Sequence, residues 1–251
     1  MTQFEDLLGT DFEGRHTADV DDVIYGGYDH PHHRARVPGL VDLLGDTSAP
    51  DRERYLACLA LVAWGEPAGY EALQRATLSS RSAPWYDLVI DRKFSVDSSY
   101  GQFSAAVADS RELAEEKNSS ALRVETFRSL IRIANHEYFE EKLGDYLEES
   151  VVQACLTDIR DVIVQGLGSL GTGAPARFDL ATQLVDLANS VVTVDEELAV
   201  DLIWQILHAS PTERTMVHAV TAVQRAKGKA GRALAVYLTT VGNARVRSLL
   251  A

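Results

Sequence analysis

Apolar side chains recur every three to four residues through most of this 251-residue sequence. That spacing places one apolar stripe along a helix, whereas a half-buried strand alternates apolar and polar residues. Strict alternation is almost absent. We therefore expect an all-α protein.

Turn residues divide this pattern into short helical segments. Gly26-Gly27, Ser79 to Pro84 and Gly171-Thr-Gly-Ala-Pro175 are examples of the breaks. Ser210 and Thr193 each begin a capping-box pattern, so we expect them to cap the helices that follow. Helices joined by short loops pack antiparallel. The expected helices are 2–9, 19–26, 35–45, 50–64, 67–78, 84–94, 98–117, 120–135, 137–143, 146–167, 175–190, 194–209, 211–226, 230–240 and 243–250.

The segment from Val37 to Leu73 carries a recognisable repeat pattern. A first helix ends in paired leucines, Asp51 and Arg54 open a second helix rich in alanine and leucine, and Gly65-Glu-Pro67 leads into the next helix. This segment resembles a bacterial HEAT repeat, and residues 123–134 and 213–223 show weaker forms of it. The resemblance implies a single domain over residues 1–251, built as a HEAT-like α-α superhelix, a solenoid of antiparallel helical hairpins. Residues 79–100 read as an insertion in it.

Charge is unevenly distributed along the chain, whose formal net charge is −13. Residues 1–29 hold eight acids against Arg15, whereas residues 212–251 hold seven bases against Glu213. An acidic chain repels the phosphate backbone, so we do not expect nucleic acid as the partner. The basic C-terminal end leaves a nucleic-acid binder as an alternative.

The sequence gives no sign of export or membrane insertion. Its apolar runs are shorter than the roughly 20 residues that cross a bilayer, and the first residues lack a basic and apolar signal pattern. Cys58 and Cys155 both lie in apolar helical patterns, which indicates buried thiols without a disulfide. We expect a cytoplasmic protein with no membrane partner.

Searches for catalytic and cofactor patterns favour a protein that is not an enzyme. Gly166-Leu-Gly-Ser-Leu-Gly171 matches the letters of a dinucleotide loop, but it continues a helical pattern, so we expect a glycine-rich helix end. His136-Glu137 is a single pair, whereas the HEAT-repeat hydroxylases that resemble deoxyhypusine hydroxylase use several. We expect no cofactor and no metal.

One alternative remains open, an enzyme with a pocket in the solenoid groove. His30, His32 and His33 would make it metal-dependent, although adjacent histidines are poorly spaced for zinc.

The function we expect is a protein-protein interaction module. An acidic HEAT-like protein could act as an inhibitor or immunity-type protein that binds a basic partner on its concave face. Aromatic residues beside carboxylates suit a surface that accepts Lys and Arg, with core packing as the alternative for Trp85 and Tyr25. The expected partner-binding residues are Asp19, Asp21, Asp22, Tyr25, Tyr28, Trp85 and Tyr86.

Overall fold

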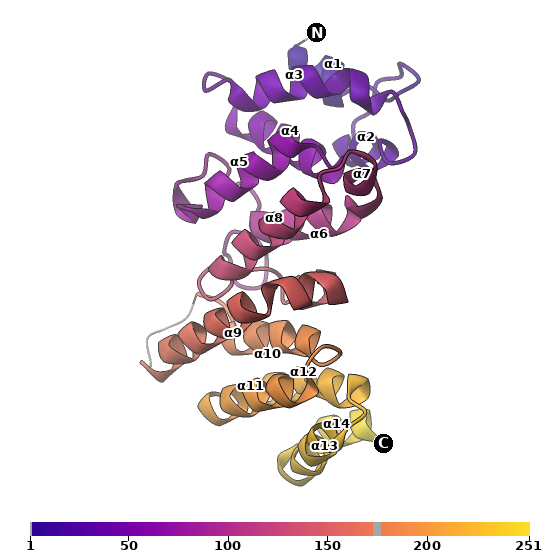
Figure 1. Ribbon diagram of the computed structural model, residues 1–251. Helices are drawn as coiled ribbons and strands as arrows, with labels where there is room; N and C mark the ends of the chain where they lie inside the picture. Colours follow the sequence, from indigo (N-terminus) through magenta and orange to yellow (C-terminus); the bar gives the residue numbers. More distant parts are fainter. Residues whose placement is uncertain (1, 173–176) are drawn as a thin grey trace. The chain divides into compact units, whose positions relative to one another are not determined.

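The computed structural model describes residues 2–172 and 177–251. Within these ranges it contains fourteen α-helices, two short 3-10 helices and no β-strand (Figure 1). The expectation of an all-α protein is confirmed. The chain divides into two compact units, residues 1–90 with 102–130 and residues 91–101 with 131–251.

Most helices belong to a single unit, whereas α6 and α8 contribute residues to both. The first unit holds α1 (Gln3–Leu8), α2 (Val20–Gly26), α3 (His33–Gly45), α4 (Asp51–Ala63), α5 (Pro67–Thr77) and α7 (Arg111–Glu116). The shared helices are α6 (Ser99–Asp109) and α8 (Ser120–Ile133). The second unit holds α9 (Glu149–Gly171), α10 (Leu180–Val191), α11 (Glu196–Ala209), α12 (Glu213–Arg225), α13 (Lys229–Val241) and α14 (Ala244–Leu250).

Helix α4 is the core of the first unit, with α3 and α5 packed against it. It ends at Ala63, and Gly65, two residues on, has a φ of +70° that is available to glycine without strain. The Gly65 amide donates to the Val62 carbonyl at 3.0 Å, and the Glu66 amide donates to the Leu61 carbonyl at 2.9 Å. This pair of bonds is the Schellman motif, and Pro67 then opens α5. The Gly65-Glu-Pro67 pattern therefore ends one helix and begins the next.

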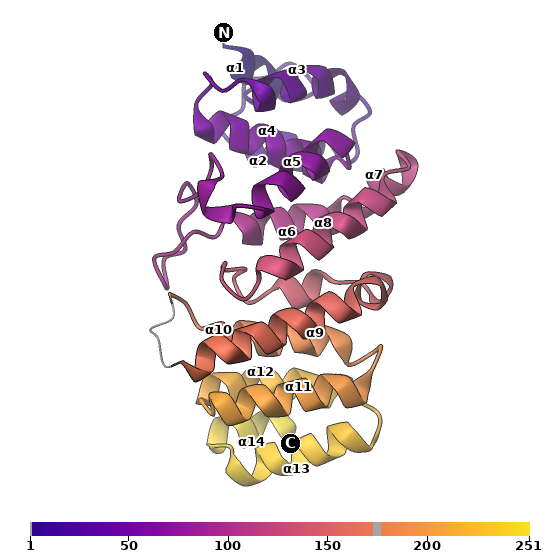
Figure 2. The ribbon, with the colours of Figure 1, turned by 60° about the vertical axis from the view of Figure 1, so that its left-hand side comes forward.

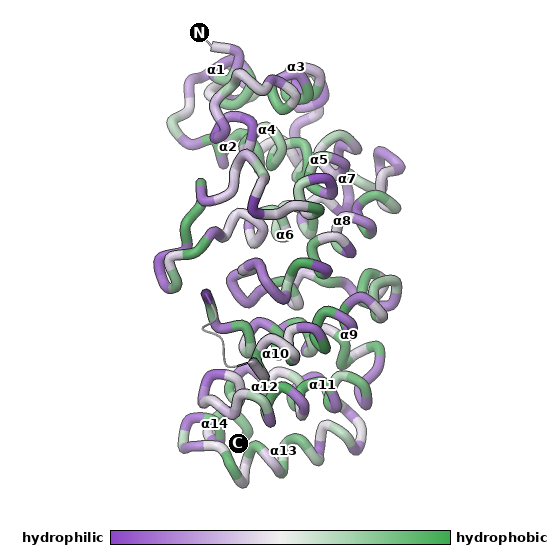
Figure 3. The backbone as a smooth tube through the Cα atoms, turned by 90° about the vertical axis from the view of Figure 1, so that its left-hand side faces the viewer, coloured by the Kyte–Doolittle hydropathy of each residue, from purple (hydrophilic) through white to green (hydrophobic). Residues whose placement is uncertain are grey.

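In the second unit, each helix from α9 to α12 contacts the next helix and the next but one. Helices α9, α11 and α13 lie one after another, with α10, α12 and α14 beside them (Figures 1 and 2). Green apolar and purple polar stretches alternate along these helices (Figure 3), as one-sided packing requires. The second unit is thus a two-layered stack of helices.

Helix α10 is buried over its whole length, so its polar side chains need partners inside the protein. Gln183 donates to the carbonyls of Ala134 and Glu137 at 2.7 and 2.9 Å, and its oxygen accepts from the Phe139 amide at 2.8 Å. The helix thereby holds the loop that follows α8.

Two expected helices are absent. Residues 84–94 form turns, because Asp87 has a φ of +65° and the Asp91 carboxylate accepts from the Lys93 and Phe94 amides. Residues 137–143 also leave helical geometry, since Glu140 and Glu141 have φ values of +56° and +61°. Both predictions were wrong, because side-chain bonding and tertiary contacts outweighed the apolar spacing.

Several boundaries differ from the expected ones. The helix expected over 98–117 is divided at Ser110 into α6 and α7. Thr212 caps α12 in place of Ser210, and Asp195 caps α11 in place of Thr193. The expected helix 175–190 begins at Leu180, and residues 175 and 176 lie outside the described part of the chain.

Three further expectations concern burial and the membrane. Cys58 and Cys155 are both buried free thiols. Gly166, Gly168 and Gly171 all lie in α9, which fits the helical reading of the glycine pattern. Within the described ranges, none of the helices is both long enough and apolar enough to span a bilayer.

Candidate functional site

The first unit places three of the expected partner-binding acids at the start of α2. Asp19 caps this helix by accepting from the Asp21 amide at 3.0 Å. Asp21 and Asp22 follow in the first turn, where the helix dipole favours negative charge. All three residues are exposed. Among the residues that the structure describes, none of their carboxylates has a basic partner within ion-pair distance.

Like charges crowd around Asp21. Desolvation by the surrounding protein raises the pKa of its carboxyl group above the ordinary value, and the neighbouring Asp19 and Asp22 carboxylates raise it further. Keeping these three negative charges close together therefore costs free energy. A cation brought close to them would remove part of that cost.

Two tyrosines stand at the other end of α2. Tyr25 is 47% exposed and its ring lies 5.9 Å from that of Tyr28. Tyr28 is half-buried, and its hydroxyl has no hydrogen-bond partner among the described residues. Burial raises the pKa of this hydroxyl, and Asp109 adds to the shift. The structure therefore places Tyr25 in the last turn of α2, the helix that carries the acids, and Tyr28 just beyond its end.

The histidine cluster is built into the packing of the first unit. His30 stacks on Phe12 with 4.8 Å between ring centres, and His32 lies edge-on to His30. His33 is buried, with Nδ1 2.8 Å from the His30 carbonyl and Nε2 2.9 Å from Lys117 Nζ. Both ring nitrogens of His33 thus have protein partners.

These contacts bear on the metal alternative. Within the described ranges, no group of three or more His, Cys, Asp or Glu side chains is arranged to hold a metal ion. Among the described residues, His30, His32 and His33 therefore do not form such a ligand group.

Trp85 lies apart from the acids of α2, in the wall of a cavity of about 560 Å³. Its indole packs against Tyr55 and Phe103 at 6.5 and 5.3 Å between ring centres and is only 3% exposed. Tyr86, the next residue, is half-buried. Trp85 is thus an anchor for the loop after α5, and only a ligand inside the cavity would touch it.

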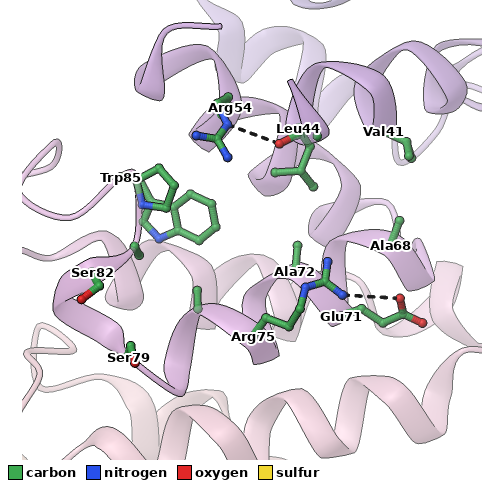
Figure 4. A pocket seen from close by; sticks show the side chains of 14 residues that line it. Val41, Leu44, Arg54, Ala68, Glu71, Ala72, Arg75, Ser79, Ser82 and Trp85 are labelled. Atoms are coloured by element: carbon green, nitrogen blue, oxygen red, sulfur yellow. Dashed lines mark hydrogen bonds and ion pairs between the residues drawn. The ribbon is translucent and has the colours of Figure 1, made fainter. Parts of the chain in front are cut away.

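Helices α3 and α5 form the other walls of this cavity, and Arg54 of α4 reaches into it (Figure 4). Val41 and Leu44 of α3 face the small side chains of α5. Arg75 lies at the rim, where it contacts Glu71 at 3.9 Å. The lining is completed by Gly45, Ala68, Ala72, Ala76, Ser79, Ser82, Ala83 and Pro84.

A second cavity, of about 580 Å³, lies in the second unit beside Lys93, Arg214, His218 and Arg245. Its charges are largely paired within the protein. Arg214 forms ion pairs with Glu141 and, at 3.7 Å, with Asp179, while Lys93 lies 3.6 Å from Glu141. Burial lowers the pKa of His218. This cavity therefore offers little unpaired charge to a ligand.

Several bases of the C-terminal end are also paired. Arg225 contacts Asp145 at 3.0 Å, and Arg245 lies 3.8 Å from Glu213. These contacts reduce the positive charge that a nucleic acid could use, so they weaken the nucleic-acid alternative.

Sequence reasoning found the acids and the tyrosines of α2 but missed the cavity. Ala68, Ala72 and Ala76 recur every four residues on α5 and leave room on one face, which was the available signal.

No protein-family model, curated protein or solved structure matches this chain.

Proposed function

We propose that the protein is a binding module made of stacked helical hairpins, and that it takes a basic partner protein on the acidic surface of α2. The observation that carries this proposal is the cluster of Asp19, Asp21 and Asp22, which are exposed without a basic partner among the described residues. Desolvation raises the pKa of Asp21 and repulsion from Asp19 and Asp22 adds to the shift, and a cation-rich surface would relieve this repulsion.

The packing of each unit supports the hairpin architecture. In the second unit the helices contact their next and next-but-one neighbours, which is the pattern that repeat proteins use to bury one continuous core. In the first unit the Gly65-Glu-Pro67 turn joins α4 to α5 as the HEAT-like pattern implies. An extension of this proposal is that the module is an inhibitor or immunity-type protein.

Tyr25 extends the acidic surface with an exposed ring. A lysine or arginine that reaches the carboxylates could rest its cation on the tyrosine face, a contact worth about 0.5–1 kcal/mol at exposed sites. Long-range attraction should speed association and weaken with salt, since the Debye length is about 8 Å at physiological ionic strength.

The first prediction tests this surface by neutralising two acids while keeping the helix cap. Asp21→Asn with Asp22→Asn leaves Asp19 to accept from the residue 21 amide. In a pull-down from native cell extract followed by mass spectrometry, the wild type should retain a protein with a basic isoelectric point. Surface plasmon resonance on that partner should show association by the variant slowed roughly tenfold at low salt.

The matched control is Glu112→Gln with Glu115→Gln, two exposed acids on α7 that change the net charge equally. This control should associate much faster than the α2 variant. The proposal fails if the retained partner is acidic or is a nucleic acid. It also fails if both variants lose association equally, since overall charge would then explain the effect.

A further inference from the structure

We propose that the cavity between α3 and α5 is a binding site for a monocarboxylate with an apolar body. The inference is independent of the acidic surface, because it concerns other residues and the opposite charge. At about 560 Å³ the cavity falls within the roughly 300–1,000 Å³ of small-molecule sites.

Arg54 supplies the charge that such a ligand needs. Its side chain is only 15% exposed, and its guanidinium makes two weak contacts, to the Leu44 carbonyl at 3.3 Å and to Asp51 at 3.5 Å. A guanidinium has five N–H donors, so most of them stay available to the cavity. The Asp51 carboxylate is solvent-exposed and screened, so it leaves most of this charge uncompensated.

The uncharged polar side chains in the lining can all donate a hydrogen bond. Trp85 Nε1 is buried and has no acceptor among the described residues. Ser79 and Ser82 are exposed residues of the lining, and their hydroxyl groups can donate as well as accept a hydrogen bond. The Arg54 guanidinium and the buried Trp85 Nε1 can only donate, so they favour a ligand that accepts hydrogen bonds.

The charge balance favours one negative charge over two. Arg75 and Glu71 are both exposed and bring one charge of each sign to the lining, so Arg54 gives the lining a formal net charge of +1. A single guanidinium matches one carboxylate in bidentate geometry. The remaining wall is built by Val41, Leu44 and the alanines of α5, so the rest of the ligand should be apolar.

Two sources share this chemistry, a free small amphipathic acid and the C-terminal carboxylate of a polypeptide. The probes are therefore hexanoate with hexanol as its neutral counterpart, and the dipeptide Ala-Leu with its C-terminal amide. Binding is followed by the indole N–H signals in a proton–nitrogen correlation spectrum. Trp64 provides an internal reference, because its Nε1 already donates to the Ile24 carbonyl at 2.8 Å.

We expect at least one acid to move the Trp85 signal to saturation at millimolar concentration while the Trp64 signal stays in place. Its neutral counterpart should bind roughly tenfold to a hundredfold more weakly, because it lacks the charge-assisted bond. Trp85→Phe assigns the signal. The acid that binds more tightly identifies the source.

Two variants tie the binding to the cavity. Arg54→Gln should reduce affinity roughly tenfold or more, whereas Arg52→Gln, an exposed neighbour outside the lining, should leave it unchanged. Ala68→Leu fills the cavity without altering charge and should also abolish binding, which keeps the test valid if Arg54→Gln fails to fold. The proposal is overturned if neither acid moves the Trp85 signal, if the neutral probes bind as tightly, or if Ala68→Leu binds like the wild type.

Discussion

At the scale of single residues, Glu141 carries a buried carboxylate. It has a left-handed backbone conformation and pairs with Arg214 and Lys93, while its Oε1 accepts no hydrogen bond among the described residues. A buried charge is stable only while its ion-pair partners are present. Removing Arg214 should therefore cost more stability than removing the ion-pair partner of an exposed acid.

Arg214→Met should therefore lower the free energy of unfolding by about 3–5 kcal/mol, because it leaves the Glu141 charge buried. Arg245→Met removes a partner at 3.8 Å from the exposed Glu213 and should cost no more than about 1 kcal/mol. Urea unfolding measures both. Equal losses in the two variants would contradict the special role of Arg214. Adding Glu141→Gln should recover part of the larger loss.

A second residue-scale prediction concerns Asp186 on α10. Burial raises its pKa well above 3.8, and Asp145 adds to the shift, although the Gly144 amide and Arg225 oppose it. A raised folded-state pKa means that the folded protein holds the proton more tightly. This contribution to stability is present below about pH 3.8 and is lost as pH rises through the folded pKa.

Asp186→Asn does not titrate and can still accept from the Gly144 amide. Relative to the wild type it should be nearly neutral near pH 4 and more stable at pH 7, by about 1–3 kcal/mol. Urea unfolding across this pH range gives the difference. Asp201→Asn, on the exposed side of α11, should show no such rise. A difference that stays constant with pH would show that folding does not raise the pKa of Asp186.

At the scale of elements, α11 supplies the cap of α13. The Glu196 carboxylate accepts from the amides of Lys227, Gly228 and Gly231 at 2.7 to 2.9 Å. These three bonds lower the pKa of Glu196, so its contribution to stability is lost as pH falls below the ordinary value. Gly228 cannot cap the helix with a side chain of its own, so the neighbouring helix performs this role.

Glu196→Gln should speed hydrogen exchange at the amides of residues 227, 228 and 231 and lower the urea midpoint. The neighbouring acid Glu197 is exposed, and Glu197→Gln serves as the matched control with little effect on either measurement. Unchanged exchange at these three amides in the Glu196 variant would show that the α13 end is stabilised by something else.

Elements with regular apolar spacing and turn residues could be predicted from the sequence. Helix α4 and the exit at Gly65 are clear examples. The segments around Asp87 and Glu141 could not, because their backbone is held by side-chain bonds and long-range ion pairs that a spacing rule does not contain. The acids at the start of α2 could be predicted, because they form a charge cluster in the sequence. The cavity that contains Arg54 could not, because one of its walls is the loop that carries Trp85.

At the scale of the whole molecule, two of the three points where the chain passes from one unit to the other lie inside helices. Gly101 and Gln102 lie in α6, and Leu130 and Ile131 lie in α8, yet each pair is split between the units. Both units therefore include part of α6 and part of α8. Since helix formation is cooperative, unfolding one unit should destabilise the helices that it shares with the other.

The last prediction is that the chain unfolds in one transition despite its two units. Trp64 and Trp85 report on the first unit and Trp204 on the second. With fluorotryptophan in all three positions, fluorine NMR should give coincident urea midpoints that also match the loss of helical circular dichroism. Ser129→Pro interrupts α8 near the boundary at a cost of about 3 kcal/mol and should separate the midpoints. Separate midpoints in the wild type would show that the shared helices do not couple the units.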